Sequence, residues 1–327
     1  MNIIFITSGF KAVYYFFEQR VVKAFQNAGH YCESFTLNNK GLNALKLMEQ
    51  SLQPDLIFAM AGLKISVPIL EFLKETKAKS AIWMTEDPYY MDWTLPLIPY
   101  FDYIFTIDQA AVEQYKRLGH PYVYHLPLGT DPEVFHSTLV SKEFTSDICL
   151  VGVPYSNRIE LIEFLLKRTD YQIQIVGRGW SKHKYEWIKN SNRDLDLANA
   201  WVKPETVVNY YNGSKIILNI HRPPDEKYNK NRMGIIAKSI NNRTFDAASC
   251  EAFQLLDSKE DLVNHFEEGK EIVSFEDKHD LLEKIHYYIA HDEERKQIAH
   301  NARKRVLTSH TFQHRIDHLL MKLQSEI

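Results

Sequence analysis

Short apolar runs alternate with longer amphipathic stretches along this chain, and this alternation constrains the fold more than any other feature. The first runs are Ile3 to Ile6, Cys32 to Leu37 and Asp55 to Ala59, and a helical stretch from about Val13 to Ala28 follows the first run. Apolar runs separated by helical spacing are typical of βαβ units, whose parallel sheet is buried on both faces. The series continues with Ala81 to Met84, Tyr103 to Thr106 and Tyr122 to His125.

The series is interrupted between Leu126 and Phe135, where two prolines and a glycine break regular structure. A polar stretch follows, and we interpret the whole region as a linker. A chain of 327 residues is also too long for one ordinary α/β core. The sequence therefore predicts two doubly wound α/β domains, at 1–137 and 138–327. The strands expected in the second are Asp147 to Val151, Gln172 to Val176, Ile216 to Ile220, Phe253 to Leu256 and Glu271 to Phe275.

Composition argues against several classes of function. The net charge of -3 disfavours binding to nucleic acid. The three cysteines have neither disulfide-framework nor zinc-ligand spacing, and no apolar stretch is as long as a membrane span. The start of the chain lacks the features of a signal peptide, so we expect a cytoplasmic protein. Asp194 to Asp196 has the letters of a metal-binding Asp-x-Asp, but its polar surroundings favour a loop, and we expect no metal.

The most informative segment runs from Asn242 to Leu256. Thr244 is expected to cap a helix that begins near Phe245, and free N–H groups at such a terminus can bind a diphosphate. Arg243 would add a phosphate contact, and Asp246 could accept hydrogen bonds from two ribose hydroxyls. The local features alone favour a simpler interpretation, in which Thr244 and Asp246 only cap a helix and Arg243 is solvated.

The wider pattern of motifs resembles the C-terminal half of group 1 glycosyltransferases, and more narrowly the CgeB-like spore maturation and spore coat branch of bacilli. That branch has a motif close to Arg-x-Phe-Glu-Ala-x-Ala-Cys-Gly-Ala. Arg243 and Phe245 match it, whereas Asp246 replaces the Glu and Glu251 replaces the Gly. In the N-terminal half, Trp83 to Tyr89 resembles the Trp-x-x-Glu-Asp-Pro segment of the same branch.

The resemblance implies a GT-B architecture, with two facing Rossmann-like domains and a cleft between them, and a last helix (about 311–327) that packs on the N-terminal domain. It implies a donor that is a nucleoside-diphosphate sugar, with uracil or thymine as the base, and no cofactor. A role in spore surface-layer maturation would follow. The donor-binding residues expected in the C-terminal domain are Gly152, Tyr155, Arg158, Gly177, Arg178, Asn219, His221, Arg243, Thr244, Phe245 and Asp246.

The N-terminal domain would receive the acceptor, whose identity the sequence does not give. Gly9 and Phe10 lie in its first strand-to-helix turn, on the expected acceptor side. Glu86 and Asp87 follow a strand, and either could be the general base of an inverting transferase. A simple turn at Pro88 is the alternative, and a retaining mechanism would need no such base. Two other functions stay open: a non-catalytic nucleotide-binding spore protein, and a sugar-nucleotide epimerase of the same architecture.

Overall fold

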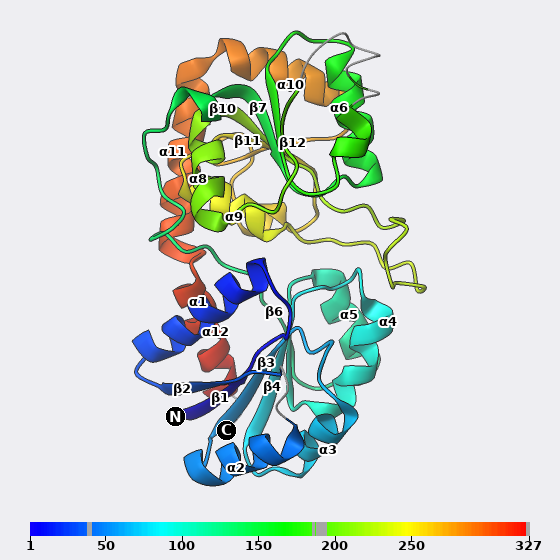
Figure 1. Cartoon of the computed structure of the whole chain (residues 1–327), viewed down its shortest axis with the longest axis vertical. Helices are drawn as coiled ribbons and strands as arrows, with labels where there is room; N and C mark the ends of the chain where they lie inside the picture. The colour runs from blue at the N-terminus through cyan, green and yellow to red at the C-terminus, as the bar shows by residue number, and fades with distance from the viewer. Residues whose placement is uncertain (38–40, 185–186, 188–194, 325–327) are drawn as a thin grey trace. The chain divides into compact units, whose positions relative to one another are not determined.

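The computed structural model describes residues 1–37, 41–184, 187 and 195–324. The chain forms two compact units, each with a six-stranded parallel sheet (Figure 1). Unit 1 comprises Met1–Gly129, Lys227–Ser239 and Phe312–Ile327, and unit 2 comprises Thr130–Glu226 and Ile240–Thr311. The boundary expected between 137 and 138 thus differs from the observed one, because unit 1 ends earlier and takes in two later segments.

The sheet of unit 1 has the strand order β2-β1-β3-β4-β5-β6, and all its pairs are parallel. Every residue of β3 is buried, as expected for a sheet covered on both faces. The strands are β1 (Asn2–Ile6), β2 (Tyr31–Phe35), β3 (Leu56–Met60), β4 (Lys79–Met84), β5 (Tyr103–Thr106) and β6 (Val123–His125). The helices are α1 (Val13–Asn27), α2 (Leu42–Leu52), α3 (Val67–Glu75), α4 (Met91–Thr94), the 3-10 helix η1 (Leu95–Tyr100), α5 (Gln109–Arg117) and α12 (Phe312–Gln324).

The last helix, α12, packs against α1 within unit 1 (Figure 1). The rings of Phe17 and Phe312 lie 5.9 Å apart, and Nε2 of Gln313 donates to the carbonyl oxygen of Ala24 at 3.2 Å. The C-terminal end of the chain therefore completes the layer of helices over the first sheet.

The sheet of unit 2 has the order β12-β11-β10-β7-β8-β9, again with every pair parallel. Its strands are β7 (Ser146–Val151), β8 (Ile173–Val176), β9 (Asp196–Ala198), β10 (Ser214–Asn219), β11 (Gln254–Asp257) and β12 (Val273–Phe275). Its helices are α6 (Ser156–Leu166), α8 (Pro204–Gly213), α9 (Asn242–Ser249), α10 (Lys278–Ala290), α11 (Asp292–Ser309) and the 3-10 helices η2 (Lys142–Phe144) and η3 (Leu262–Asn264).

The edge strand β9 is a correction to the sequence analysis, which interpreted this stretch as a loop. Asp196 begins the strand and pairs with Gln174 of β8. Asp194, the other carboxylate of the Asp-x-Asp, lies outside the described residues. The strand has only three residues and begins with an exposed aspartate, so it lacks the apolar run that identified the other strands.

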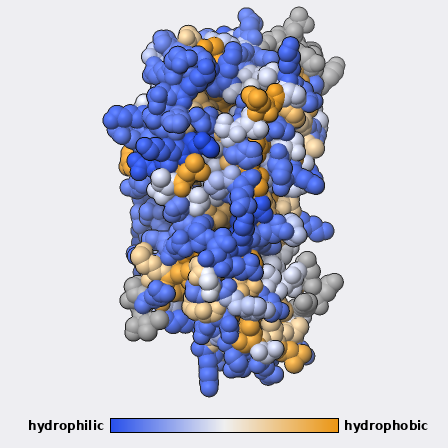
Figure 2. Space-filling model, turned by 90° about the vertical axis from the view of Figure 1, so that its left-hand side faces the viewer, coloured by the Kyte–Doolittle hydropathy of each residue, from blue (hydrophilic) through white to orange (hydrophobic). Residues whose placement is uncertain are grey.

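No helix among the described residues combines the length and the apolar character needed to cross a membrane. On the face seen in Figure 2, hydrophobic residues form small separate groups among hydrophilic ones. Scattered groups of this size are normal for a protein surface and do not by themselves indicate a docking face.

Candidate functional site

Each sheet has one point where the chain reverses the direction in which it adds strands. In unit 1 this point lies between β1 and β3, and in unit 2 it lies between β7 and β10. At such a point the loops after two neighbouring strands lead away in opposite directions, which leaves room for a ligand outside the carboxyl ends of the strands. These two sheet edges are therefore the first places to look for a site.

In unit 2, two glycines bring the ends of β7 and β8 into close contact. Gly152 has φ 150° and Gly177 has φ 153°, backbone angles that residues with a side chain rarely adopt. A Cβ on Gly152 would lie 2.5 Å from Nη1 of Arg158, and a Cβ on Gly177 would overlap the carbonyl oxygen of Gly152. Glycine is thus required at both positions, and both residues are partly exposed at the sheet edge.

Arg158 joins the two strands that flank the switch point of unit 2. Its Nε and Nη2 donate to the carbonyl oxygen of Ile220 at 3.0 and 2.5 Å, and its Nη1 donates to that of Val153 at 2.9 Å. The side chain is buried, and the guanidinium carbon lies 4.6 Å from the ring centre of Tyr155. Because its donors already bind backbone carbonyl oxygens and hold the end of β10, Arg158 supports the backbone of this edge in place of the phosphate contact that we expected.

His221 also has both ring nitrogens engaged inside unit 2. Its Nδ1 lies 2.7 Å from a carboxylate oxygen of Asp257, and the backbone N–H of Asn241 donates to its Nε2 at 3.1 Å. These partners assign the proton to Nδ1 and leave the ring neutral. Burial lowers the pKa of His221 and favours the same form. The contact to sugar or phosphate expected of His221 is thus replaced by an internal one, which fixes the loop before α9.

Helix α9 begins earlier than the sequence predicted, and this changes the place of its residues. It spans Asn242–Ser249, so Thr244 lies inside its first turn instead of capping it. The Thr244 hydroxyl accepts from Nδ2 of Asn219 at 2.9 Å, and Oδ1 of Asn219 accepts from Nε of Arg243 at 3.3 Å. Thr244 and Asn219 are buried. These two side chains therefore hold α9 against the end of β10.

Phe245 and Asp246 point into unit 2 as well. Phe245 is fully buried and stacks on Phe266, with ring centres 6.0 Å apart. Asp246 is 5% exposed, and Nδ2 of Asn242 donates to its carboxylate at 3.1 Å. Burial raises the pKa of Asp246 to about 7. The donor contacts expected of both residues thus give way to internal contacts, because their side chains face the core side of α9.

The polar groups that stay available at this edge are fewer. Arg178, directly after β8, is exposed and has no hydrogen-bond or ion-pair partner within the described part of the chain. Arg243 is partly exposed, and its Nη2 donates to the carbonyl oxygen of Ile220 at 3.1 Å. Tyr155 is partly exposed, and its ring lies near the guanidinium groups of Arg158 and Arg222, at 4.6 and 5.4 Å. The loops at this edge thus carry guanidinium groups and an aromatic ring, residue types suited to an anion attached to a planar group.

One supporting residue of this edge escaped the sequence analysis. Oδ1 of Asn199, which follows β9, accepts from the backbone N–H groups of Gly179, Trp180 and Ser181 at 3.0, 2.8 and 3.1 Å. The indole of Trp180 donates to the carbonyl oxygen of Gly152 at 2.7 Å. Nothing in the sequence signalled Asn199, because the strand that positions it was not recognised.

In unit 1, the turn after β1 is fixed from two sides. The backbone N–H and hydroxyl of Ser8 donate to the carboxylate of Glu18 at 2.7 and 2.5 Å. From the end of β3, Nζ of Lys64 donates to the carbonyl oxygen of Gly9 at 2.8 Å and lies 4.2 Å from the ring centre of Phe10. The switch point of unit 1 thus presents Gly9 and Phe10 together with an exposed lysine that the sequence analysis missed.

Glu86 and Asp87 follow β4, the next strand of this edge, and they lie in opposite environments. Glu86 is partly exposed and accepts a short hydrogen bond from the hydroxyl of Tyr14. Asp87 is 1% exposed and accepts hydrogen bonds at 2.8 Å from three hydroxyls, those of Thr94, Thr106 and Tyr115. Burial raises the pKa of Asp87 to about 6. Of the two acids, Glu86 is the one whose side chain is partly exposed, whereas both oxygens of Asp87 accept hydrogen bonds inside the core.

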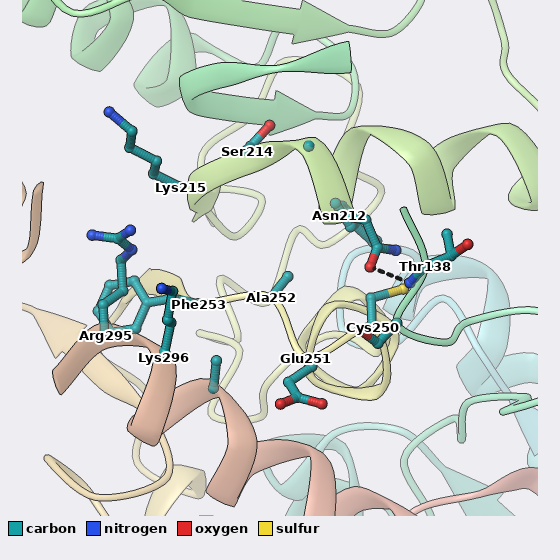
Figure 3. A pocket seen from close by; sticks show the side chains of 14 residues that line it. Thr138, Asn212, Ser214, Lys215, Cys250, Glu251, Ala252, Phe253, Arg295 and Lys296 are labelled. Carbon is teal, nitrogen blue, oxygen red and sulfur yellow. Dashed lines mark hydrogen bonds between the residues drawn. The ribbon is translucent and has the colours of Figure 1, made fainter. Parts of the chain in front are cut away.

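A pocket of about 340 Å³ lies at the opposite edge of the second sheet, where β10 and β11 begin (Figure 3). Its charged residues already have partners, since Lys215 pairs with Asp147, and Arg295 and Lys296 both pair with Asp292. This pocket is therefore separate from the carboxyl edge and offers a ligand no unpaired charge.

Comparison with known proteins shows the family and the fold of this chain. Residues 158–321 match the model of the family described as Glycosyl transferase-like. Spore protein CgeB of Bacillus subtilis (strain 168) is 33% identical over 325 residues, which cover 99% of this chain and 98% of that protein. Among solved structures, sucrose-phosphate synthase from Thermosynechococcus elongatus aligns with a TM-score of 0.72 at 13% identity, covering 100% of both chains.

A second solved structure is Anabaena HepE in complex with UDP and glucose. It aligns with a TM-score of 0.71 at 10% identity, covering 99% of this chain and 100% of that chain. At such identities the likeness concerns the fold alone. Together with the two parallel sheets, it confirms the GT-B architecture that the sequence predicted.

Proposed function

We propose that this chain transfers a glycosyl group from a UDP-sugar or TDP-sugar to an acceptor. The chain belongs to the glycosyl transferase-like family, and CgeB is related to it over nearly its full length. The observation that carries the proposal is the edge of unit 2, where Gly152 and Gly177 bring the ends of β7 and β8 together and the loops carry the exposed Arg178 and the partly exposed Arg243. UDP is the preferred nucleotide, because the HepE structure was solved with UDP and glucose.

In this proposal the diphosphate lies between Arg178 and Arg243, beside the ends of β7 and β8. Guanidinium groups form paired hydrogen bonds with phosphate oxygens, and the N-terminus of α9 adds a favourable dipole. These groups offset the negative charge that develops on the leaving diphosphate. The reaction therefore needs no metal ion in our proposal, and Tyr155 would stack on the sugar or the base.

On the acceptor side we propose Glu86 as the general base. The acceptor hydroxyl gives its proton to the Glu86 carboxylate while its oxygen bonds to the anomeric carbon, and the bond from that carbon to the diphosphate breaks. Tyr14 would hold the carboxylate in place through its short hydrogen bond. Asp87 is the weaker candidate, since both of its oxygens already accept hydroxyl hydrogen bonds. This route inverts the anomeric configuration of the donor sugar.

The relationship to CgeB also suggests a biological setting. We propose that the enzyme acts in the cytoplasm on a component of the spore surface layer. A structural spore protein with a nucleotide site, or a sugar-nucleotide epimerase, would retain the same fold and nucleotide binding but would not transfer sugar.

The deciding experiment incubates the purified protein with UDP-glucose and, separately, with other UDP- and TDP-sugars, and measures released nucleotide and free or transferred sugar. We expect slow nucleotide release without an acceptor, unchanged by EDTA. A change of the sugar into its epimer would instead identify an epimerase, and tight nucleotide binding without any turnover would identify a structural protein. Loss of the activity in EDTA would contradict the metal-independent mechanism.

A further inference from the structure

Four partly exposed aromatic side chains form a row at the carboxyl edge of the first sheet. We call Phe10, Tyr14, Tyr90 and Trp93 the aromatic strip. The ring centres of Phe10 and Tyr14 lie 5.1 Å apart, and those of Tyr90 and Trp93 lie 5.2 Å apart. The two pairs are linked through Tyr14, whose hydroxyl bonds to Thr85 and Glu86 in the segment that leads to Tyr90. All four residues belong to unit 1.

The strip differs from the aromatic residues of the core. Trp83 and Phe58 are fully buried, whereas Trp93 is 49% exposed and the other three strip residues are partly exposed. Their packing therefore does not complete the core. A row of rings that remains in contact with water is suited to a ligand with flat apolar faces, and a pyranose ring presents such a face of C–H groups.

A lysine lies at each end of the strip. Nζ of Lys64 is 4.2 Å from the ring centre of Phe10, and Nζ of Lys230 is 6.0 Å from that of Trp93. Lys230 comes from the distant segment Lys227–Ser239, and two backbone hydrogen bonds fix it there. Its N–H donates to the carbonyl oxygen of Tyr89 at 2.8 Å, and its carbonyl oxygen accepts from the N–H of Asp92 at 2.7 Å. Both lysine side chains are exposed, so their charges can meet an anionic ligand.

The middle of the strip carries a different chemistry. There the hydroxyl of Tyr14 bonds to the carboxylate of Glu86 and lies 3.0 Å from the hydroxyl of Thr85. This centre can exchange hydrogen bonds with a sugar hydroxyl, but it would repel an anionic group. Charges at the ends and hydroxyl chemistry in the middle do not suit a polynucleotide, whose backbone carries a phosphate at every step.

We propose that the aromatic strip binds an acidic oligosaccharide as the acceptor, with its carboxylate or phosphate groups at Lys64 and Lys230 and an uncharged sugar hydroxyl at Glu86. This inference rests on the proposed transferase function only for the role of Glu86. The acceptor must span several sugar residues, because the rings extend from the turn after β1 to helix α4. Negative charge on the glycan selects it over neutral glycans of equal length.

The test measures binding to the full chain by isothermal titration calorimetry, with hexagalacturonate as the acidic probe and cellohexaose as the neutral one. We expect hexagalacturonate to bind about tenfold more tightly, and this preference to shrink between about 50 and 500 mM sodium chloride, where screening weakens exposed ion pairs. Trp93→Ala should weaken binding about tenfold, as for the loss of a stacking platform. Lys64→Gln and Lys230→Gln should each weaken it about two- to fivefold.

Two variants on unit 2 serve as matched controls. Tyr287→Ala removes an aromatic ring that is 45% exposed, and Lys304→Gln removes an exposed lysine. Both should bind hexagalacturonate like the wild type. Lys64→Gln keeps the test valid even if Trp93→Ala fails to fold, because Lys64 is exposed. Equal affinity for the two hexasaccharides, tighter binding of oligo(dT), or equal effects of the strip and control variants would overturn the proposal.

The same preparations are titrated with UDP, so that failure of this inference and failure of the proposed function can be told apart. UDP binding and UDP-glucose turnover without binding of hexagalacturonate would overturn the acidic acceptor alone. Binding of hexagalacturonate at the strip without any turnover would support the strip while the transferase function failed.

Discussion

At the scale of single residues, two neighbouring acids of this protein differ in their exposure to solvent. Glu86 and Asp87 follow the same strand, yet one carboxylate meets the sheet edge and the other enters the core. In the bend and turn after β4, the Glu86 side chain stays partly exposed while that of Asp87 is buried. The sequence offered both acids as candidates for a general base, and the three hydroxyls around Asp87 distinguish their environments.

Replacement of these two acids should therefore give different results. Glu86→Gln should lower sugar transfer by about 10²–10⁴-fold, the usual effect of losing a general base, with UDP affinity unchanged. Asp87→Asn places an amide among three hydroxyl donors and should destabilise the protein by about 1–3 kcal/mol. Transfer rates and urea unfolding of both variants check this. If Asp87→Asn abolished transfer without a loss of stability, Asp87 would be the base.

The buried carboxylate of Asp246 should make stability depend on pH. Its pKa rises from 3.8 to about 7 on folding, because burial disfavours the charged form. The folded state thus keeps a proton that the unfolded state has released, so the free energy of unfolding falls as pH rises between these values, by about 1.4 kcal/mol for each pKa unit. Urea unfolding at several pH values should show a weaker decrease for Asp246→Asn. Equal slopes for both proteins would mean that Asp246 is not the source.

Arg243 offers a test of the diphosphate site. Arg243→Ala should weaken UDP binding by about 1.5–3 kcal/mol, the contribution of a charged hydrogen bond, with little effect on uridine. Arg178→Ala should act in the same direction. Calorimetric titration with UDP and with uridine measures both effects, and a control at the exposed Lys304→Gln should change neither. Equal losses for UDP and uridine would show that Arg243 does not contact phosphate.

At the scale of elements, the shape of the proposed nucleotide site in unit 2 depends on how closely the ends of β7 and β8 approach each other. The sequence showed glycines after both strands, a pattern that usually serves only a turn. The structure gives them a stronger reason, since the backbone of Gly177 packs directly on the carbonyl group of Gly152. This contact leaves no space for a side chain, and the neighbouring backbone cannot move away as a flexible side chain would.

Gly177→Ala should therefore be more harmful than a typical substitution of a glycine with positive φ. We expect a loss of about 1–3 kcal/mol in stability, the range for overpacking, together with weaker UDP binding. Gly119→Ala is the matched control, because Gly119 has φ 90° but open space around its Cα. Thermal unfolding and UDP titration compare the two. If both substitutions lowered stability equally, the loss would come from the positive φ alone and not from the contact with Gly152.

At the scale of the whole molecule, the segments of the chain are interleaved. Unit 1 is completed by Lys227–Ser239 and by α12, which follow most of unit 2 in the sequence. The first of these segments delivers Lys230 to the aromatic strip, so the proposed acceptor surface combines residues from the start and the later part of the chain. Neither unit therefore corresponds to one continuous segment of the chain.

Nucleotide binding to the intact protein should appear as stabilisation. A ligand that binds only the folded state raises the free energy of unfolding, by about 2.7 kcal/mol when its concentration is a hundred times Kd. The unfolding temperature rises with it. We expect UDP or TDP to raise the midpoint in a thermal-shift assay, whereas NAD and ATP do not, because the chain lacks GxGxxG and Walker motifs. An equal or larger shift with NAD would contradict the nucleotide-sugar assignment.

The sequence by itself determined the two α/β sheets, nearly all of their strands and the family, because apolar periodicity and motif order are local properties of the chain. Only the tertiary structure decided which polar side chains remain available. Arg158, Asn219 and His221 bear groups that suit a ligand, but their hydrogen-bond partners come from segments distant in sequence. Lys64 and Lys230 carried no motif, and the packing of separate segments placed them beside Phe10 and Trp93. The sequence gives the chemistry of each side chain, whereas its partners depend on which distant groups the fold brings within hydrogen-bond distance.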